Sequence, residues 1–136
     1  MTELIDLATA RPTGKPNCCL VLPKGWGTGP AHRESPAFNA DATTLAQAAS
    51  DLLASTPRTE ILARSPDGLQ IEAAERSRLF RFVDRISLRA VPAGTDRSSV
   101  ALFSRSLVGY WDLGVNRKRV ERLLERLGTS LNQGTP

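Results

Sequence analysis

The chain has 136 residues, of which 40% are hydrophobic and 24% are charged, and its formal net charge is +4. This length suits one domain with a core of its own, and no apolar run approaches the ~20 residues that a membrane-spanning helix needs. Residues 1–10 contain two acidic residues and neither Lys nor Arg, unlike a secretory signal peptide. We therefore expect a single cytoplasmic domain without membrane contact.

The positive charge is concentrated in the second half of the chain. Residues 69–136 hold 12 basic and 7 acidic residues, whereas residues 1–68 hold 6 basic and 7 acidic ones. Eleven of those 12 are Arg, whose planar guanidinium suits bidentate contacts to carboxylate or phosphate. The pattern is compatible with a small anionic ligand, although a solvated basic surface gives the same pattern. Aromatic residues make up only 5% of the chain and no nucleic-acid-binding motif is present, so nucleic acid is not an expected partner.

Residues 1–40 are expected to be irregular. Five prolines and four glycines interrupt residues 11–40, which is too many for a helix or a long strand. Apolar side chains at Leu20, Val21, Leu22 and Trp26 give the segment something to bury, so we expect it to drape over the domain.

Two adjacent cysteines, Cys18 and Cys19, lie in this segment. Neither a CxxC pair nor a His-rich stretch follows, so a zinc site is not expected. Side chains alternate in direction along an extended chain, so at most one of the two faces inward and acts as a small buried residue. A reactive thiol is the alternative, and its base would have to be His32, the only histidine.

Residues 41–128 are predicted to form the folded domain, beginning with a helix over about 43–55. Asp41 or Thr43 can cap this helix, and Pro57 ends it. Its apolar face has helical spacing and consists of Leu45, Ala49, Leu52 and Leu53.

Four strands are predicted next, over residues 59–64, 69–73, 82–91 and 98–106. The sequence Ser-Pro-Asp-Gly at 65–68 has the chemistry of a tight turn between the first two. Matching the apolar faces of the last two strands places Leu88 opposite Leu102 and Asp84 opposite Ser106.

A second helix is predicted over about 115–127, and Gly128 suits the position after its end. Residues 129–136 are expected to be a frayed tail. The order helix, four strands, helix indicates an α+β fold, in which a small antiparallel sheet of about four strands is flanked by the two helices.

Asp84 breaks the pattern of its strand, because it shares a face with the apolar Phe82, Ile86 and Leu88. A carboxylate on a buried face is costly unless it is paired. Asp84 is therefore either solvated or part of a structural ion pair. The alternative is that it acts as a catalytic acid or base.

The start of the last helix is the second exception, because Arg117, Lys118 and Arg119 oppose the helix dipole there. Free backbone N–H groups at a helix start can bind an anion, and Asp112 can instead cap them. The candidate ligand-binding residues are Tyr110, Asp112, Asn116, Arg117 and Arg119. Ion pairs between these arginines and nearby carboxylates are the alternative interpretation.

Asn116 and Arg119 share a helix face, whereas Arg117 points elsewhere. Because the strand end at Asp84 meets Ser106 shortly before the helix begins, we expect Asp84, Asn116 and Arg119 to converge.

Residues 109–121 resemble the C-terminal signature of the bacterial and plastid family named domain of unknown function 1499. The matching positions are Gly109-Tyr110 and the run from Asp112 to Glu121. Shorter blocks that resemble the same family are Pro16-Asn17-Cys18, Pro57-Arg58 and Phe82-Val83-Asp84. The resemblance extends over roughly residues 16–127 and implies a fold, but the family has no established activity to carry over.

Some positions depart from that family pattern. Leu107 stands where Arg is usual, Trp111 where Ser is common and Arg85 where Asp is common, and an additional Arg near Phe103 is missing. If the family has a polar site on these strands, this chain has lost part of it.

Several classes of function stay open. We favour a binding module for a small anionic or amphipathic ligand. The alternative is a small enzyme with Asp84 as acid or base and Arg117 or Arg119 holding a carboxylate-bearing substrate. A protein-interaction domain is a further alternative. No metal-ligand set, nucleophile elbow or phosphate loop is present, so neither a metal nor a cofactor is expected.

Overall fold

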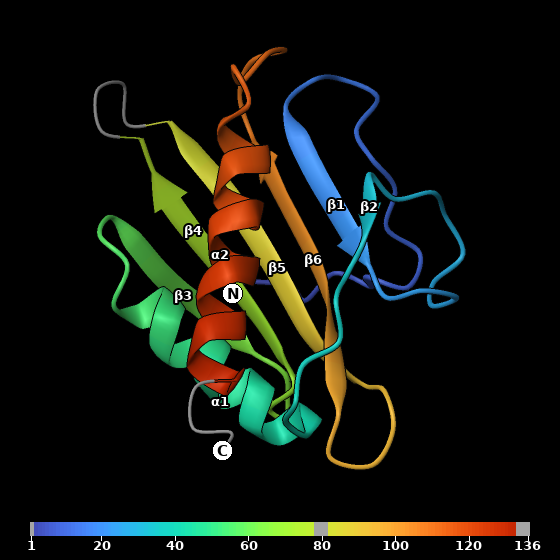
Figure 1. Ribbon diagram of the computed structural model, residues 1–136. Helices are drawn as coiled ribbons and strands as arrows, with labels where there is room; N and C mark the ends of the chain where they lie inside the picture. Colours follow the sequence, from blue (N-terminus) through green and yellow to red (C-terminus); the bar gives the residue numbers. More distant parts are fainter. Residues whose placement is uncertain (1, 78–81, 133–136) are drawn as a thin grey trace.

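In the computed structural model, which describes residues 2–77 and 82–132, two helices cover one face of a six-stranded sheet (Figure 1). In chain order the elements are β1 (Cys18–Leu22), β2 (Arg33–Glu34), α1 (Ala42–Ala54), β3 (Thr59–Arg64), β4 (Gln70–Arg76), β5 (Val83–Pro92), β6 (Ser98–Ser106) and α2 (Val115–Asn132). The strands lie in the order β2-β1-β6-β5-β4-β3. The α+β class predicted from the sequence is confirmed.

Helix α1 has the predicted N-terminal cap. The Asp41 carboxylate accepts a hydrogen bond of 2.7 Å from the backbone N–H of Thr44, and this bond lowers the pKa of Asp41. The helix ends shortly before Pro57, as a proline requires. Its buried residues are Leu45, Ala46, Ala49, Ser50 and Leu53.

The strand pairs β3–β4 and β5–β6 are antiparallel, and the second pair has the predicted register. Leu88 pairs with Leu102 and Asp84 pairs with Ser106. Apolar side chains of both strands thereby face the helices, whereas Asp84 and Ser106 lie where the sheet meets the start of α2. Face matching was sufficient to fix this register, because a slip of one residue would turn every side chain to the other face.

The sheet has two strands more than predicted, because residues 1–40 are not irregular throughout. β1 pairs antiparallel with β6, and the short β2 pairs parallel with β1, so the sheet is mixed and not purely antiparallel. β1 has the sequence Cys-Cys-Leu-Val-Leu, and both of its faces are covered. A strand covered on both faces shows no alternation of polar and apolar residues, so periodicity did not reveal it.

Helix α2 continues to Asn132, beyond the predicted end at Leu127. Gly128 lies within the helix instead of ending it, and Leu131 extends the apolar stripe that packs on the core. The prediction of a frayed tail is therefore wrong for residues 129–132, and residues 133–136 lie outside the described part. Neither helix in the described residues is both long and apolar enough to cross a membrane.

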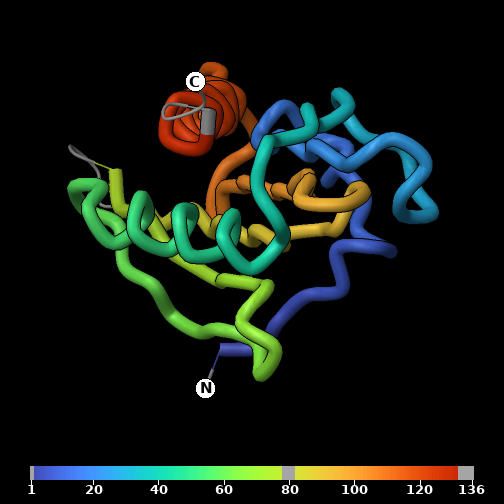
Figure 2. Tube along the Cα trace, turned by 60° about the horizontal axis from the view of Figure 1, so that its bottom comes forward, coloured from blue at the N-terminus to red at the C-terminus, as the bar shows by residue number. Residues whose placement is uncertain are grey.

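Both faces of the sheet are covered. On one face, α1 and α2 pack over a core that includes Ile86 and Leu102. On the other face, Leu7 packs against Leu20 and Phe103. Figure 2 shows the dark-blue N-terminal segment on the side of the sheet opposite α2. The chain before β1 thus supplies the second apolar layer.

We predict that Leu7→Ala lowers the free energy of unfolding by about 2–4 kcal/mol, because Leu7 is only 1% exposed and its removal leaves a cavity. Urea unfolding monitored by circular dichroism measures the change. The control is Leu4→Ala, at a side chain that is 39% exposed, for which we expect about 0.5 kcal/mol or less. Equal effects of the two variants would contradict the packing of this segment.

Candidate functional site

A buried polar cluster lies between the start of α2 and the sheet. We call it the Arg119 cluster, and its side chains are Glu75 from β4, Asp84 from β5, Ser104 and Ser106 from β6, Asn116 and Arg119 from α2, and Asp112 just before α2. The strand residues continue the faces that carry Ile86 and Leu102 further along the sheet. Polar residues therefore replace apolar ones at the end of the sheet where α2 begins.

Arg119 is the centre of the cluster and is only 4% exposed. Its Nη1 lies 2.9 Å from Asp84 Oδ2 and donates to Asn116 Oδ1 at 2.8 Å. Its Nη2 lies 2.9 Å from Glu75 Oε2. One buried guanidinium thus pairs with carboxylates from two adjacent strands. Removing either the arginine or a carboxylate would leave a buried charge without its partner and lower the stability of the fold.

Asn116 connects three parts of the chain and is fully buried. Its Nδ2 donates to the backbone oxygen of Asn17 at 3.0 Å and to Ser106 Oγ at 2.9 Å. Its Oδ1 accepts a bond of 2.6 Å from Ser104 Oγ. The side chain therefore joins α2 to β6 and to the segment that leads into β1.

Asp112 caps α2. Its Oδ1 accepts from the backbone N–H of Gly114 at 2.8 Å, and its Oδ2 accepts from the backbone N–H of Asn116 at 3.1 Å. The carboxylate thus takes N–H groups that could otherwise face an anion.

The structure separates the candidate residues into two groups. The predicted convergence of Asp84, Asn116 and Arg119 is confirmed. Arg117 and Tyr110 lie on the surface: the Arg117 side chain is 77% exposed and forms an ion pair of 3.2 Å with Glu121.

Sequence reasoning missed Glu75. The predicted strand ended at Ala73, whereas β4 continues to Arg76 and keeps its alternation, so that Glu75 follows Ile71 and Ala73 on the helix-facing side. Extending that alternation by two residues would have placed a second carboxylate beside Asp84, because the two residues pair across β4 and β5.

A small pocket opens beside Glu75. It has a volume of about 200 Å³, and we call it the Arg58 pocket; its lining residues are Thr56, Pro57, Arg58, Glu75, Arg122 and Arg126. No carboxylate of the described residues lies within ion-pair distance of the guanidinium groups of Arg58, Arg122 and Arg126. The pocket thus has three arginines without a carboxylate partner in the described chain.

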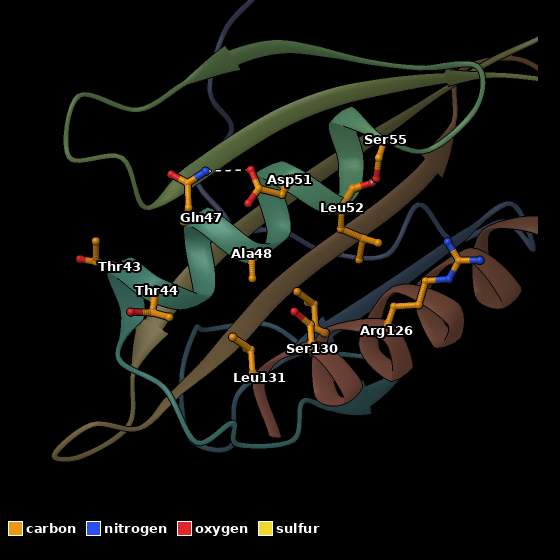
Figure 3. Close-up of a pocket in the computed structure, with 11 residues that line it drawn as sticks. Thr43, Thr44, Gln47, Ala48, Asp51, Leu52, Ser55, Arg126, Ser130 and Leu131 are labelled. Carbon is orange, nitrogen blue, oxygen red and sulfur yellow. Dashed lines mark hydrogen bonds between the residues drawn. The ribbon is translucent and has the colours of Figure 1, made fainter. Parts of the chain in front are cut away.

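A longer groove of about 700 Å³ runs between α1 and α2. Figure 3 shows Ala48 and Leu52 of α1 directed toward Ser130 and Leu131 of α2, with Arg126 further along the same helix. Arg126 also lines the Arg58 pocket, so the groove and the pocket adjoin at that side chain.

Cys18, Cys19 and His32 line another pocket of about 360 Å³, so the fold does bring the only histidine close to both thiols. Burial raises the pKa of the Cys19 thiol, and the Cys18 thiol adds to this effect. His32 Nδ1 accepts a hydrogen bond of 2.8 Å from the backbone N–H of Leu20. The raised pKa disfavours the thiolate form of Cys19 and therefore its role as the reactive thiol. The described residues contain no group of three or more His, Cys, Asp or Glu arranged to hold a metal ion.

The family model described as "Protein of unknown function (DUF1499)" matches residues 8–127. The chain belongs to the DUF1499 family. No curated protein matches the sequence. Among solved structures, a START superfamily protein from Mycobacterium smegmatis is similar with a TM-score of 0.46 and 17% identity, over 74% of this chain and 96% of that chain.

Residues in all four blocks that resemble the DUF1499 family meet at one end of the sheet. Asn17 contacts Asn116, Asp84 contacts Arg119, and Arg58 lines the pocket beside Glu75. The separate blocks of this DUF1499 protein therefore form one connected region around the start of α2.

We predict that Arg119→Ala lowers the free energy of unfolding by about 3–5 kcal/mol, because it leaves Glu75 and Asp84 buried without their cation. Chemical denaturation measures this loss. The matched control is Arg117→Ala, whose exposed ion pair is worth about 0–1 kcal/mol.

If Arg119→Ala does not fold, Glu75→Gln replaces it in the same measurement, since it removes one carboxylate and leaves Arg119 paired with Asp84. Its loss of stability should fall between those of the two arginine variants. An Arg119→Ala protein as stable as Arg117→Ala would contradict the structural role of the cluster.

Proposed function

We propose that this DUF1499 protein is a binding module for a small amphipathic anion, with its apolar part in the groove between α1 and α2 and its charged group at the Arg58 pocket. The observation that carries the proposal is the position of Arg58, Arg122 and Arg126 at one end of a partly apolar groove, without carboxylate partners among the described residues. Guanidinium groups bind carboxylates and phosphates with charge-assisted hydrogen bonds.

The groove has the length and lining for an apolar chain. The part of α1 that lines it runs from Thr43 to Ser55, which corresponds to about 18 Å of helix. Ala48, Leu52 and Leu131 supply apolar surface that a hydrocarbon chain would cover. The groove is open to water, and its polar lining includes the Asp51 carboxylate beside hydroxyl and amide groups, so we expect moderate affinity.

In this proposal the Arg119 cluster positions the site and does not contact the ligand. Arg119 pairs with Glu75, which lines the Arg58 pocket, and it thereby fixes α2 relative to β4. Asn116 and Asp112 hold the start of the same helix. The direction of α2, and with it the position of Arg122 and Arg126, depends on these contacts.

The geometry supports binding better than catalysis by Asp84. Its carboxylate is buried beside Arg119 and lines neither the groove nor the Arg58 pocket. A general acid or base needs to come within hydrogen-bond reach of a substrate, and the pairing with Arg119 stands in the way.

Dodecanoate, titrated below its micellar concentration in a calorimeter, tests the proposal. We expect it to bind, and we expect Arg126→Gln to weaken binding by about tenfold, the change that corresponds to loss of one charge-assisted hydrogen bond. Ala48→Leu should also weaken binding, because its side chain would fill the groove.

The matched control is Arg97→Gln, which removes the same charge from the turn between β5 and β6 and should leave affinity unchanged. A neutral amphiphile, dodecyl maltoside, should bind more weakly than dodecanoate. The proposal fails if dodecanoate does not bind, or if Arg126→Gln and Arg97→Gln have the same affinity as the unaltered protein.

A further inference from the structure

Residues 107–115, which link β6 to α2 and include the first residue of that helix, expose an unusual amount of apolar surface. We call this segment the apolar loop, and six of its large apolar side chains are between 46% and 69% exposed: Leu107, Val108, Tyr110, Trp111, Leu113 and Val115. In Figure 1 it projects in orange beyond the end of the sheet. Single exposed apolar residues are common on protein surfaces, but six within nine consecutive residues are typical of a surface that contacts a membrane or another protein.

Two hydrogen bonds join the apolar loop to the chain before β1. Asn17 Nδ2 donates to the backbone oxygen of Gly109 at 2.9 Å, and the backbone N–H of Asp112 donates to the oxygen of Pro16 at 3.1 Å. Leu113 has a φ of +57°, a left-handed conformation that disfavours a leucine. The loop is therefore fixed to the chain before β1 while its apolar side chains face outward.

Basic residues border the apolar loop. Lys15 precedes Pro16, and Arg117 and Lys118 lie in the first turn of α2. Neither Lys15 nor Lys118 has a carboxylate within ion-pair distance in the described part of the chain. The Asp112 carboxylate already offsets part of the cost of basic residues at this helix start, and a negatively charged surface in front of the helix would offset more of it.

We propose that the apolar loop docks the protein on the surface of an anionic lipid membrane. Tyr110 and Trp111 have the amphipathic rings that favour the boundary between lipid and water, and Leu113 adds apolar surface that lipid would cover. The exposed side chains of Lys15 and Lys118 would pair with lipid phosphates.

Charge favours a membrane over a second copy of the chain. In a symmetric dimer built on this loop, the basic border of one copy would face the same border of the other. An anionic membrane would instead cover the apolar loop with lipid and attract the basic residues that border it. This contact is peripheral, so it requires no spanning helix, and it does not depend on the groove being a binding site.

Co-sedimentation with vesicles tests the proposal. We expect the protein to bind vesicles of phosphatidylcholine with phosphatidylglycerol, to bind pure phosphatidylcholine more weakly, and to dissociate as salt is raised. Trp111→Ser should weaken binding by about tenfold or more, since it removes a large apolar side chain from lipid. Lys118→Gln should weaken it by about fivefold on the anionic vesicles alone, the effect of one basic residue.

A Trp26→Phe background leaves Trp111 as the only tryptophan, so its emission should shift to shorter wavelength on the anionic vesicles. The matched control Leu4→Ser changes an exposed apolar residue outside the loop and should bind as the unaltered protein does. Arg126→Gln should also bind vesicles normally, which separates this proposal from the groove.

Absence of vesicle binding overturns the proposal, and so does unchanged binding of Trp111→Ser. Light scattering after size-exclusion chromatography identifies the main alternative: a dimer that Trp111→Ser converts to a monomer would show that a second copy covers the loop. Vesicle binding that is lost equally in Leu4→Ser would show non-specific adhesion and also overturn it.

Discussion

The ion pairs of Arg119 with Glu75 and Asp84 are the constraint on which the arrangement of this molecule depends. They bring one guanidinium from α2 between carboxylates of two adjacent strands, and all three side chains are largely buried. Charges in such a place tolerate little displacement, because each loses its partner when the helix moves. The contact therefore fixes where α2 begins on the sheet, and the packing of Leu123, Leu124 and Leu127 follows along the same helix.

The fixed start of α2 determines both surfaces that we connect with function. On one side, the helix runs beside α1 and forms the groove that ends at Arg126. On the other side, the chain leaves β6 and must reach Asp112 within a few residues, which leaves the apolar loop outside the sheet. The Asp112 carboxylate accepts from the backbone N–H groups of Gly114 and Asn116, so the start of the helix is capped from within the chain. Of the basic side chains in the first turn, Arg117 pairs with Glu121, whereas Lys118 has no carboxylate within ion-pair distance among the described residues.

The parts of the fold that were predictable from the sequence are those governed by local periodicity. The β5–β6 register followed from matching Leu88 with Leu102, and the meeting of Asp84 with Arg119 followed from that register. β1 was missed because an apolar strand covered on both faces has no period, and Glu75 was missed because its strand was ended two residues early. The pockets combine residues from distant elements, and the sequence could not distinguish an exposed Trp111 from a buried one. Tyr110 and Arg117 were therefore assigned to the same site as Asn116, although they face solvent.

The two proposals concern the same end of the sheet. Thr59, Glu75, Asp84 and Ser106 form a row of paired residues across β3, β4, β5 and β6. Arg58 precedes the first of them and the apolar loop follows the last, so three strand spacings, or about 14 Å, separate the Arg58 pocket from the loop. A membrane in contact with the loop would thus lie near the charged end of the groove, while the apolar part of the groove runs away from it along α1 and α2. The charged group of a bound amphipathic anion would then stay close to the lipid headgroups. The row of paired residues that sets the distance between the Arg58 pocket and the apolar loop includes Glu75 and Asp84, the two partners of Arg119.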